Sequence, residues 1–269
     1  MNRIKKVQIE TIRACNGRCL ICNYRGWTIL NPLRMGEGVF GQIVKQIQGL
    51  PNLETVCPYG HNEPLLDKNI FGKIRYISER MPDVRIELST NGILLTGSNI
   101  DTYCSLVDDR WVSFHGVDEP SYEYIMGIPW ANGLKLRRMI RERRDVHFDI
   151  SVGLTSKYTE QDVRDFWSKY NNVKLMIFEP RSRCSNIKSD EVKSFYRPPT
   201  PNFDCWRFNM FLVYDTYGYL LPCSNDLAEK HSYANYTMSL SEIMQKREDF
   251  RRMNREGKNT ICRFCEDSN

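Results

Sequence analysis

Three cysteines stand close together near the start of the chain, in the stretch TIRACNGRCLICNY. Cys15, Cys19 and Cys22 have the spacing C-x3-C-x2-C, and no fourth cysteine follows nearby. Thiolates are soft ligands that suit zinc and iron–sulfur clusters. A structural zinc site would need a fourth ligand from elsewhere, such as His61 or His115. A [4Fe–4S] cluster held by three cysteines would instead keep one iron open for a second molecule, which makes it a site for chemistry.

Four more cysteines in the last third of the chain form a second group. Cys205 and Cys223 flank two apolar runs around the turn sequence DTYG, and Cys262 and Cys265 form a C-x2-C pair. The thiol count alone fits zinc and an iron–sulfur cluster equally well. These four cysteines therefore predict a second metal site, which could hold either zinc or an iron–sulfur cluster.

Strand-like and helix-like stretches alternate up to about residue 180, and these elements must position the first cysteines. Apolar runs rich in Val, Ile, Leu and Phe predict strands at 6–13, 53–59, 84–90, 110–116, 146–154 and 173–179. Amphipathic runs predict helices at 37–50, 67–80, 99–107, 119–126, 130–143 and 159–170. Such alternation favours a parallel sheet, open or curled into part of a barrel. In such barrels the chemistry lies on loops after the strands, where the first cysteines fall.

The pattern changes near residue 180. A polar, proline-containing segment leads to the two apolar runs around DTYG, which predict a hairpin. A helix is expected at 239–254, with Ser239 near its N-cap and Glu242 three residues on. We therefore predict an α/β protein in two parts: a partial (β/α)6 TIM-like barrel at 1–183, and a crossover with a small α+β appendage at 184–269.

The bulk composition is that of a globular chain with a real core. Of the 269 residues, 41% are hydrophobic and 12% aromatic, and the formal net charge is +5. No run of about 18 apolar residues occurs, so we expect no membrane span. The first residues, MNRIKKVQIE, lack the apolar segment of a secretory signal, so we expect a cytoplasmic protein with reduced thiols. The basic run 135–144 predicts a solvated helix face, with a surface for a phosphate or a nucleic acid as the alternative.

The cysteine motif directly after a first strand resembles the signature of the radical S-adenosylmethionine (radical SAM) superfamily. Further motifs follow in that family's order. YGHNEPLL resembles the GGEP segment, with Gly60 and Glu63 in place and His61 and Asn62 between them. LSTNGILLT resembles TTNG, and VSFHG resembles ISLDG. The resemblance implies that the open iron binds SAM and that an electron from the cluster cleaves SAM to a 5′-deoxyadenosyl radical, which abstracts a hydrogen atom from the substrate.

The same resemblance implies SAM contacts residue by residue. Ile21 and Leu154 would contact the adenine, and Ser113 would face the ribose or the carboxylate of SAM. The GGEP-like segment would bind the amino group, and Asn62 replaces the second glycine because Asn tolerates left-handed backbone. The expected SAM contacts are Ile21, Tyr24, Gly60, Asn62, Glu63, Ser89, Asn91, Ser113, Ser151 and Leu154.

The C-terminal part resembles the SPASM/twitch subgroup of the same superfamily. The stretch from Cys205 through VYDTYGYLLPCSND to CRFC carries this resemblance, and RSRCSN resembles the subgroup's SRAGN. A full SPASM domain has seven cysteines, whereas the four cysteines here match the shorter twitch form. Over nearly its whole length the chain resembles the small twitch dehydrogenase of aminoglycoside biosynthesis. The resemblance implies an auxiliary [4Fe–4S] cluster without an open iron, held by Cys205, Cys223, Cys262 and Cys265.

We therefore expect a radical SAM oxidoreductase that dehydrogenates a small polar or anionic substrate. The auxiliary cluster would accept an electron, and a flavodoxin or ferredoxin would be the external donor. One alternative is a redox-neutral epimerase or isomerase, with Cys184 as the candidate catalytic hydrogen-atom donor. The others are modification of a peptide, a nucleotide or a nucleic acid, which is less favoured, and a zinc-stapled binding module. Cys57 and Cys104 are expected to be small buried side chains. Candidate substrate contacts are Tyr59, His115, Asp149, Ser151, Glu179, Arg181 and Arg183.

Overall fold

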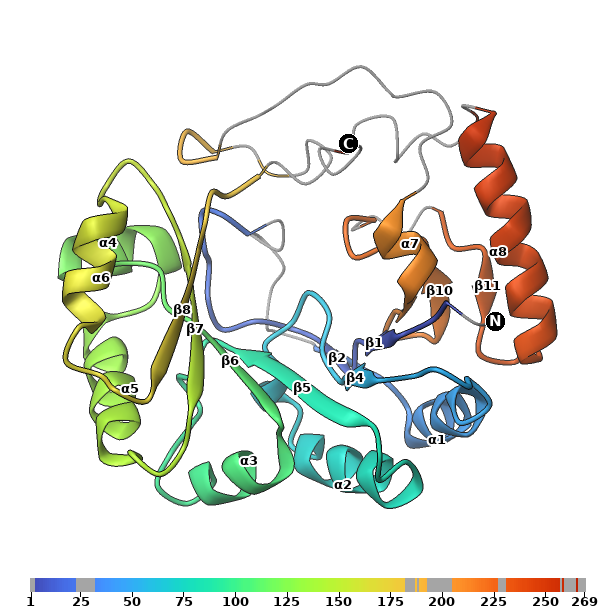
Figure 1. Cartoon of the computed structure of the whole chain (residues 1–269), viewed down its shortest axis with the longest axis horizontal. Coiled ribbons are helices and arrows are strands. Elements are labelled where there is room, and N and C mark those ends of the chain that lie inside the picture. The colour runs from blue at the N-terminus through green and yellow to red at the C-terminus, as the bar shows by residue number, and fades with distance from the viewer. Residues whose placement is uncertain are drawn as a thin grey trace.

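A computed structural model describes residues 3–22, 32–181, 187, 189–192, 205–226, 231–256, 258 and 265. The predicted barrel strands are present as β1 (Lys6–Ile9), β4 (Thr55–Cys57), β5 (Arg85–Thr90), β6 (Asp109–Ser113), β7 (Phe148–Gly153) and β8 (Val173–Phe178). They lie side by side in that order, and every neighbouring pair is parallel (Figure 1). Parallel neighbours need a crossover connection between them, which the intervening helices supply.

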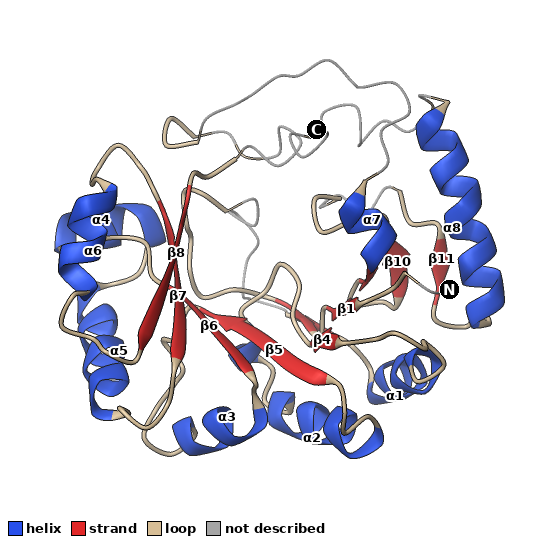
Figure 2. Cartoon of the chain, viewed as in Figure 1, coloured by secondary structure: helices blue, strands red, loops and turns tan. Residues whose placement is uncertain are grey.

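Helices cover the outer, convex side of these strands (Figures 1 and 2). They are α1 (Glu37–Ile47), α2 (Ile70–Arg80), α3 (Ile100–Leu106), α4 (Glu119–Met126), α5 (Trp130–Glu142) and α6 (Glu160–Trp167). Asp118 and Thr159 begin α4 and α6 with capping boxes, which satisfy the first backbone N–H groups of each helix. The predicted partial barrel is confirmed.

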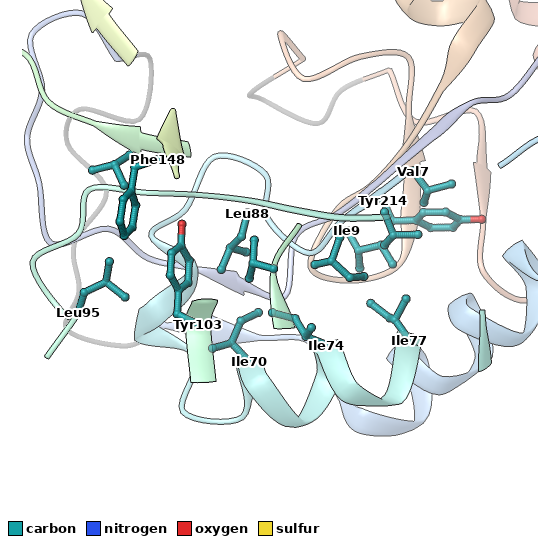
Figure 3. Packing of buried hydrophobic residues seen from close by; sticks show 14 of the residues in the cluster. Val7, Ile9, Ile70, Ile74, Ile77, Leu88, Leu95, Tyr103, Phe148 and Tyr214 are labelled. Carbon is teal, nitrogen blue, oxygen red and sulfur yellow. The ribbon is translucent and has the colours of Figure 1, made fainter. Parts of the chain in front are cut away.

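The main core lies between the sheet and these helices (Figure 3). Ile74 and Ile77 lie one turn apart on α2 and are fully buried, and Leu88 of β5 is buried in the same cluster. Its strand neighbours Glu87 and Ser89 are only partly buried. Because successive strand residues point to opposite faces, the apolar alternates pack under the helices. The polar alternates are left to the concave face, where the candidate site lies.

The predicted hairpin and terminal helix are both present in the C-terminal part. It comprises α7 (Trp206–Met210), β9 (Phe211–Tyr214), β10 (Tyr219–Leu221), β11 (Ala234–Asn235) and α8 (Leu240–Arg255). β9 and β10 are antiparallel around a turn in which Gly218 has a φ of 85°, a conformation that favours glycine. Ser239 forms the expected capping box with Glu242 at the start of α8.

This C-terminal part continues the barrel sheet. β9 pairs in parallel with β1, with Val7 opposite Leu212. Nine of the eleven described strands therefore form one sheet in the order β11-β10-β9-β1-β4-β5-β6-β7-β8. The predicted boundary between residues 183 and 184 lies outside the described residues and stays a prediction.

The first strand is shorter than predicted. The stretch 6–13 divides at Glu10, which separates β1 from β2 (Ile12–Arg13). β2 leaves the main sheet and forms a short antiparallel ribbon with β3 (Leu33–Arg34). The change of direction brings the chain to the cysteine loop. No helix in the described ranges combines the length and the apolar character that a membrane span requires.

Candidate active site

The first cysteines lie in the loop after β2, at the carboxyl end of the first barrel strand. Backbone hydrogen bonds tie this loop to the end of α4. The Arg18 N–H donates to the Met126 carbonyl at 2.9 Å, and the Leu20 N–H donates to the Ile125 carbonyl at 2.8 Å. The loop is therefore held between the first strand and the fourth helix of the barrel.

The three thiols lie close to one another. A Cβ placed on Gly17 would stand 3.6 Å from the Cys19 Sγ and 3.7 Å from the Cys15 Sγ, so both sulfur atoms border the same small space. Burial is the main cause that raises the pKa of Cys15 to about 12 and the pKa of Cys19 well above its usual value, and repulsion from Cys22 adds to both. Thiolates placed here need nearby positive charge, which the irons of a cluster supply. The donor set therefore fits an iron–sulfur cluster.

The two histidines considered as zinc ligands make other contacts. The His61 ring hydrogen-bonds the Ser224 carbonyl, and the His115 Nδ1 accepts from the Gly153 N–H at 3.1 Å. Across the part of the chain described, no three His, Cys, Asp or Glu side chains are arranged as ligands of a single metal ion. The cysteines of a [4Fe–4S] cluster each bind a different iron.

The GHNEP segment follows β4 and lies against the cysteine loop, where the Glu63 N–H donates to the Ala14 carbonyl at 2.8 Å. The Gly60 N–H donates to the Asn62 Oδ1 at 2.7 Å, which folds the segment back on itself. The Asn62 Nδ2 is buried and has no hydrogen-bond partner among the described residues. Leaving such a donor unsatisfied costs about 1–3 kcal/mol. An orphaned donor beside the cysteine loop fits a ligand with an acceptor group.

Glu63 is a buried carboxyl that joins this segment to the end of β5. Its Oε1 accepts from the Leu65 N–H at 3.0 Å and from the Thr90 hydroxyl at 2.6 Å, and its Oε2 accepts from the Asn91 N–H at 2.7 Å. Burial outweighs these bonds and raises the pKa of Glu63 to about 7. Glu63 thus positions two loops of the site, and its predicted contact with the SAM amino group stays a prediction.

Asn91, directly after β5, reaches the cysteine loop. Its Nδ2 donates to the Asn16 Oδ1 at 2.6 Å, and its Oδ1 accepts from the Ile93 N–H at 3.1 Å. Its side chain also hydrogen-bonds Cys15, which opposes the rise in the pKa of that thiol. Asn16 was not singled out from the sequence, although an amide directly after the first cysteine was a visible signal.

The ends of β6 and β7 supply a second wall. Ser113 and Ser151 are paired across the strands, with their hydroxyl oxygens 3.4 Å apart. Burial lowers the pKa of His115 to about 4, so this imidazole is neutral. Because its Nδ1 accepts from the Gly153 N–H, the proton lies on Nε2. This Nε2–H has no hydrogen-bond partner in the described part of the chain, so it is available to a ligand.

Apolar side chains close the same wall. A Cβ on Gly153 would lie 2.5 Å from the Ile21 Cδ1 and 3.3 Å from the Phe178 ring, so Ile21 packs directly on the end of β7. Leu154, the other predicted adenine contact, directly follows Gly153. Its N–H donates to the Phe178 carbonyl at 2.8 Å, so it is held close to Ile21. Ser89 lies on β5 opposite Trp111.

The second cysteine group also comes together. Cys205 is the residue directly before α7, and Cys223 lies in the loop after β10. Burial is the main cause that raises the pKa of Cys223 to about 12, and repulsion from Cys265 and Cys205 adds to it. Three of the four predicted ligands are therefore neighbours. The predicted residues Tyr24, Cys184 and Cys262 lie outside the described residues, as does Arg183.

The basic run 135–144 falls mainly on α5, away from this site. Arg137 stacks over the Phe166 ring at 3.7 Å, and Arg143 pairs with Asp145 at 2.9 Å. Other members line a hollow of about 270 Å³, together with residues of the loop before β8. These lining residues are Arg141, Arg144, Ser168, Lys169, Tyr170, Asn171 and Asn172. The hollow lies at the amino ends of β7 and β8, opposite the edge that carries the cysteines.

No family model matches the chain. Among curated proteins, the FeMo cofactor biosynthesis protein NifB of Klebsiella pneumoniae is 27% identical over 142 residues, which is 49% of this chain and 30% of that protein. The chain therefore spans less than a third of the curated relative that it matches.

Solved structures match over most of the chain. BtrN in complex with AdoMet and 2-DOIA has a TM-score of 0.67 at 19% identity, covering 98% of this chain and 93% of that one. SuiB of Streptococcus suis bound to the precursor peptide SuiA has a TM-score of 0.71 at 13% identity, covering 90% and 65%. Native anSMEcpe with bound AdoMet has a TM-score of 0.68 at 15% identity, covering 97% and 88%. At these identities the likeness is one of fold. That likeness of fold, the match to NifB and the order of the motifs together confirm the resemblance to the radical SAM superfamily.

Proposed function

We propose that the chain is a radical SAM enzyme that dehydrogenates a small polar substrate and uses a second, auxiliary [4Fe–4S] cluster as electron acceptor. The observation that carries this proposal is the meeting of three partly buried thiols with the GHNEP segment and Asn91 at the carboxyl ends of parallel strands. That edge is where barrel folds build their active sites.

Cys15, Cys19 and Cys22 would hold the first cluster, and SAM would complete it. When bound, cluster and SAM supply the electron and the 5′-deoxyadenosyl radical that removes a hydrogen atom from the substrate. Asn91 hydrogen-bonds Cys15 and so fixes one ligand, as partners of metal ligands commonly do. Asn62 offers an orphaned amide donor.

Polar groups on the concave face support a small polar substrate. Glu87 accepts from the Lys6 Nζ at 2.5 Å and from the Tyr59 hydroxyl at 2.6 Å. The Lys6 and Glu87 side chains stay 24% and 14% exposed, so solvent reaches the pair. Asp149 and Ser151 follow on β7. The neutral His115, with its unpartnered Nε2–H, adds a donor for a hydroxyl or carbonyl oxygen of the substrate.

Dehydrogenation requires the substrate radical to lose a proton and an electron. The second cysteine group would hold the acceptor of that electron, and an external flavodoxin or ferredoxin would reduce the first cluster. BtrN, whose structure contains 2-DOIA, supports a small substrate. SuiB was solved with a precursor peptide, which keeps peptide modification as the second candidate. If the second cysteine group holds zinc, a redox-neutral epimerase is favoured over both the dehydrogenase and the peptide-modifying enzyme.

The test is the anaerobic iron and sulfide content of the full chain, with SAM cleavage assayed alongside. We expect about eight irons in wild type and about four in a Cys15→Ala/Cys19→Ala/Cys22→Ala variant, with cleavage lost. A Cys57→Ala/Cys104→Ala variant is the matched control, because these two buried thiols lie outside both groups. It should keep about eight irons.

The possible outcomes separate the functions. Wild type without iron and sulfide, or with iron but without SAM cleavage, refutes the radical SAM proposal. Zinc at the second group with iron at the first keeps the radical chemistry and removes the electron acceptor. Product that carries deuterium from solvent then supports the epimerase.

A further inference from the structure

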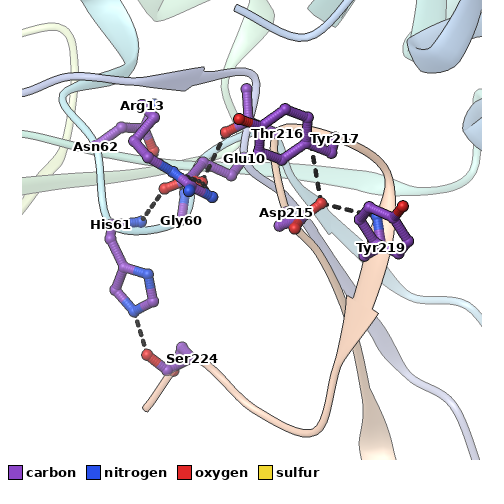
Figure 4. A network of polar contacts seen from close by, with 10 residues as sticks. All are labelled: Glu10, Arg13, Gly60, His61, Asn62, Asp215, Thr216, Tyr217, Tyr219 and Ser224. Carbon is purple, nitrogen blue, oxygen red and sulfur yellow. Dashed lines mark hydrogen bonds and ion pairs between the residues drawn. The ribbon is translucent and has the colours of Figure 1, made fainter. Parts of the chain in front are cut away.

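A buried polar network joins the GHNEP segment to the turn between β9 and β10 (Figure 4). Glu10, directly after β1, is 4% exposed. Its Oε1 accepts from the His61 N–H at 3.3 Å. Its Oε2 accepts from the Thr216 hydroxyl at 2.7 Å and from the Arg13 Nη2 at 3.1 Å. Three segments that are distant in sequence therefore meet at one carboxylate.

Close packing holds these segments in place. A Cβ on Gly60 would lie 3.0 Å from the Glu10 Cβ, so the GHNEP segment lies directly on Glu10. On the other side, Asp215 is 2% exposed and fixes the β9–β10 turn. Its Oδ1 accepts from the backbone N–H groups of Tyr217 at 2.9 Å and Tyr219 at 2.7 Å. Neither segment can shift without disturbing buried charge-assisted hydrogen bonds.

His61 extends the network to the second cysteine group. Its Nε2 hydrogen-bonds the Ser224 carbonyl (Figure 4). Because a carbonyl only accepts, the ring carries a proton on Nε2. Ser224 directly follows Cys223, whose Sγ accepts from the Asn225 N–H at 3.4 Å. This contact comes from the imidazole itself, so a residue without a polar side chain at position 61 could not make it.

We propose that Glu10 and His61 are positioning residues that couple the two cofactor sites, so that SAM binding and the redox state of the second site change one another. The inference rests on the proposed function, because it requires SAM at the GHNEP segment and a cluster at the second group. Coupling between two sites is reciprocal and is commonly about 5- to 150-fold in affinity. A tenfold coupling corresponds to a shift of about 59 mV in a one-electron midpoint potential.

The experiment uses the reconstituted full chain as wild type, as His61→Ala and as His231→Ala. The last is the matched control, because the His231 ring contacts Asp226 at 3.0 Å on the same loop. Three quantities are measured: the dissociation constant of SAM, amide hydrogen exchange over residues 219–226 with and without SAM, and the midpoint potential of the second cluster with and without SAM.

In wild type we expect SAM to slow exchange over 219–226 and to shift the potential by about 59 mV for tenfold coupling. His61→Ala should still bind SAM but lose both effects, whereas His231→Ala should keep them. His61→Gln retains a side-chain donor and should recover part of the coupling. This second variant also serves if His61→Ala does not fold.

Two results would overturn the coupling alone. In one, wild type binds SAM but neither exchange over 219–226 nor the potential changes. In the other, His61→Ala keeps the full effect of wild type. Both leave the radical SAM function intact. Wild type that binds no SAM after iron loading refutes the proposed function and the coupling together.

Discussion

Replacing Glu63 by glutamine should change how the free energy of unfolding depends on pH. Burial raises the pKa of Glu63 from 4.5 to about 7 in the folded chain, although three donors contact its carboxyl. Each pKa unit corresponds to about 1.36 kcal/mol. The difference of about 2.5 units is therefore worth about 3 kcal/mol between the ends of this pH range.

The sign follows from which state holds the proton more tightly. Below pH 4.5 the carboxyl is protonated in both states, and Glu63 adds no pH dependence. As the pH rises to 7, the unfolded chain loses this proton first, which favours unfolding. We expect wild type to lose about 3 kcal/mol relative to Glu63→Gln between pH 4.5 and 7, and nothing further above pH 7.

The assay is urea unfolding of the cluster-free chain and of Glu63→Gln at four pH values between 5 and 8. The quantity interpreted is how the difference in free energy of unfolding between wild type and Glu63→Gln changes with pH. Any destabilisation by the amide that does not depend on pH therefore cancels. Glu160→Gln is the control, because Glu160 is exposed on α6. The reasoning is refuted if this free-energy difference does not change with pH, or if wild type becomes the more stable as the pH rises. Either result would show that the three hydrogen-bond donors outweigh the effect of burial on the pKa of Glu63.

Three further substitutions test the packing around the site and the core. Gly153→Ala should cost about 1–3 kcal/mol in chemical unfolding, since its Cβ would stand 2.5 Å from the Ile21 Cδ1; an unchanged midpoint would contradict this close contact. Lys73→Met should cost about 3–5 kcal/mol, because it leaves Asp67, now 2.8 Å away, buried without its cation. Restored stability in a Lys73→Met/Asp67→Leu double variant would support that cause, and equal loss in both would refute it. Asn172→Ala removes an amide group whose Nδ2 donates its two hydrogens among three backbone carbonyls, and it should lower the thermal midpoint by several degrees; a change under one degree would argue against it.

The sequence predicted the repeating units well because their apolar residues recur with clear periods. The strands at 84–90 and 173–179 and the helix at 119–126 lie within a residue or two of the observed elements. The first strand was predicted too long, because Glu10 and Thr11 interrupt the alternation only slightly. β3 and β11 are two residues long, and so short a strand carries no periodic signal.

The site was predictable as a set of loops but not as a set of contacts. Motif order indicated that the cysteine loop, the GHNEP segment and Asn91 would meet. Tertiary contacts such as Asn16 to Asn91, or His61 to Ser224, join residues that no spacing rule relates. Glu63 shows the same limit, because its burial and its three donors arise only when the loops pack.

The position of β1 between β4 and β9 has a consequence for how the chain is made. β1 precedes β4 to β8 in the chain, yet one of its edges pairs with residues 211–214, which follow all of these strands. Until residues 211–214 have been synthesised, that edge presents unpaired backbone groups, through which sheets of different chains can join. Contacts between such distant segments also form slowly.

The C-terminal part therefore has a second role besides contributing cysteines, because β9 pairs with the otherwise free edge of β1. A chain that stops before β9 would keep one side of β1 open and should self-associate through it.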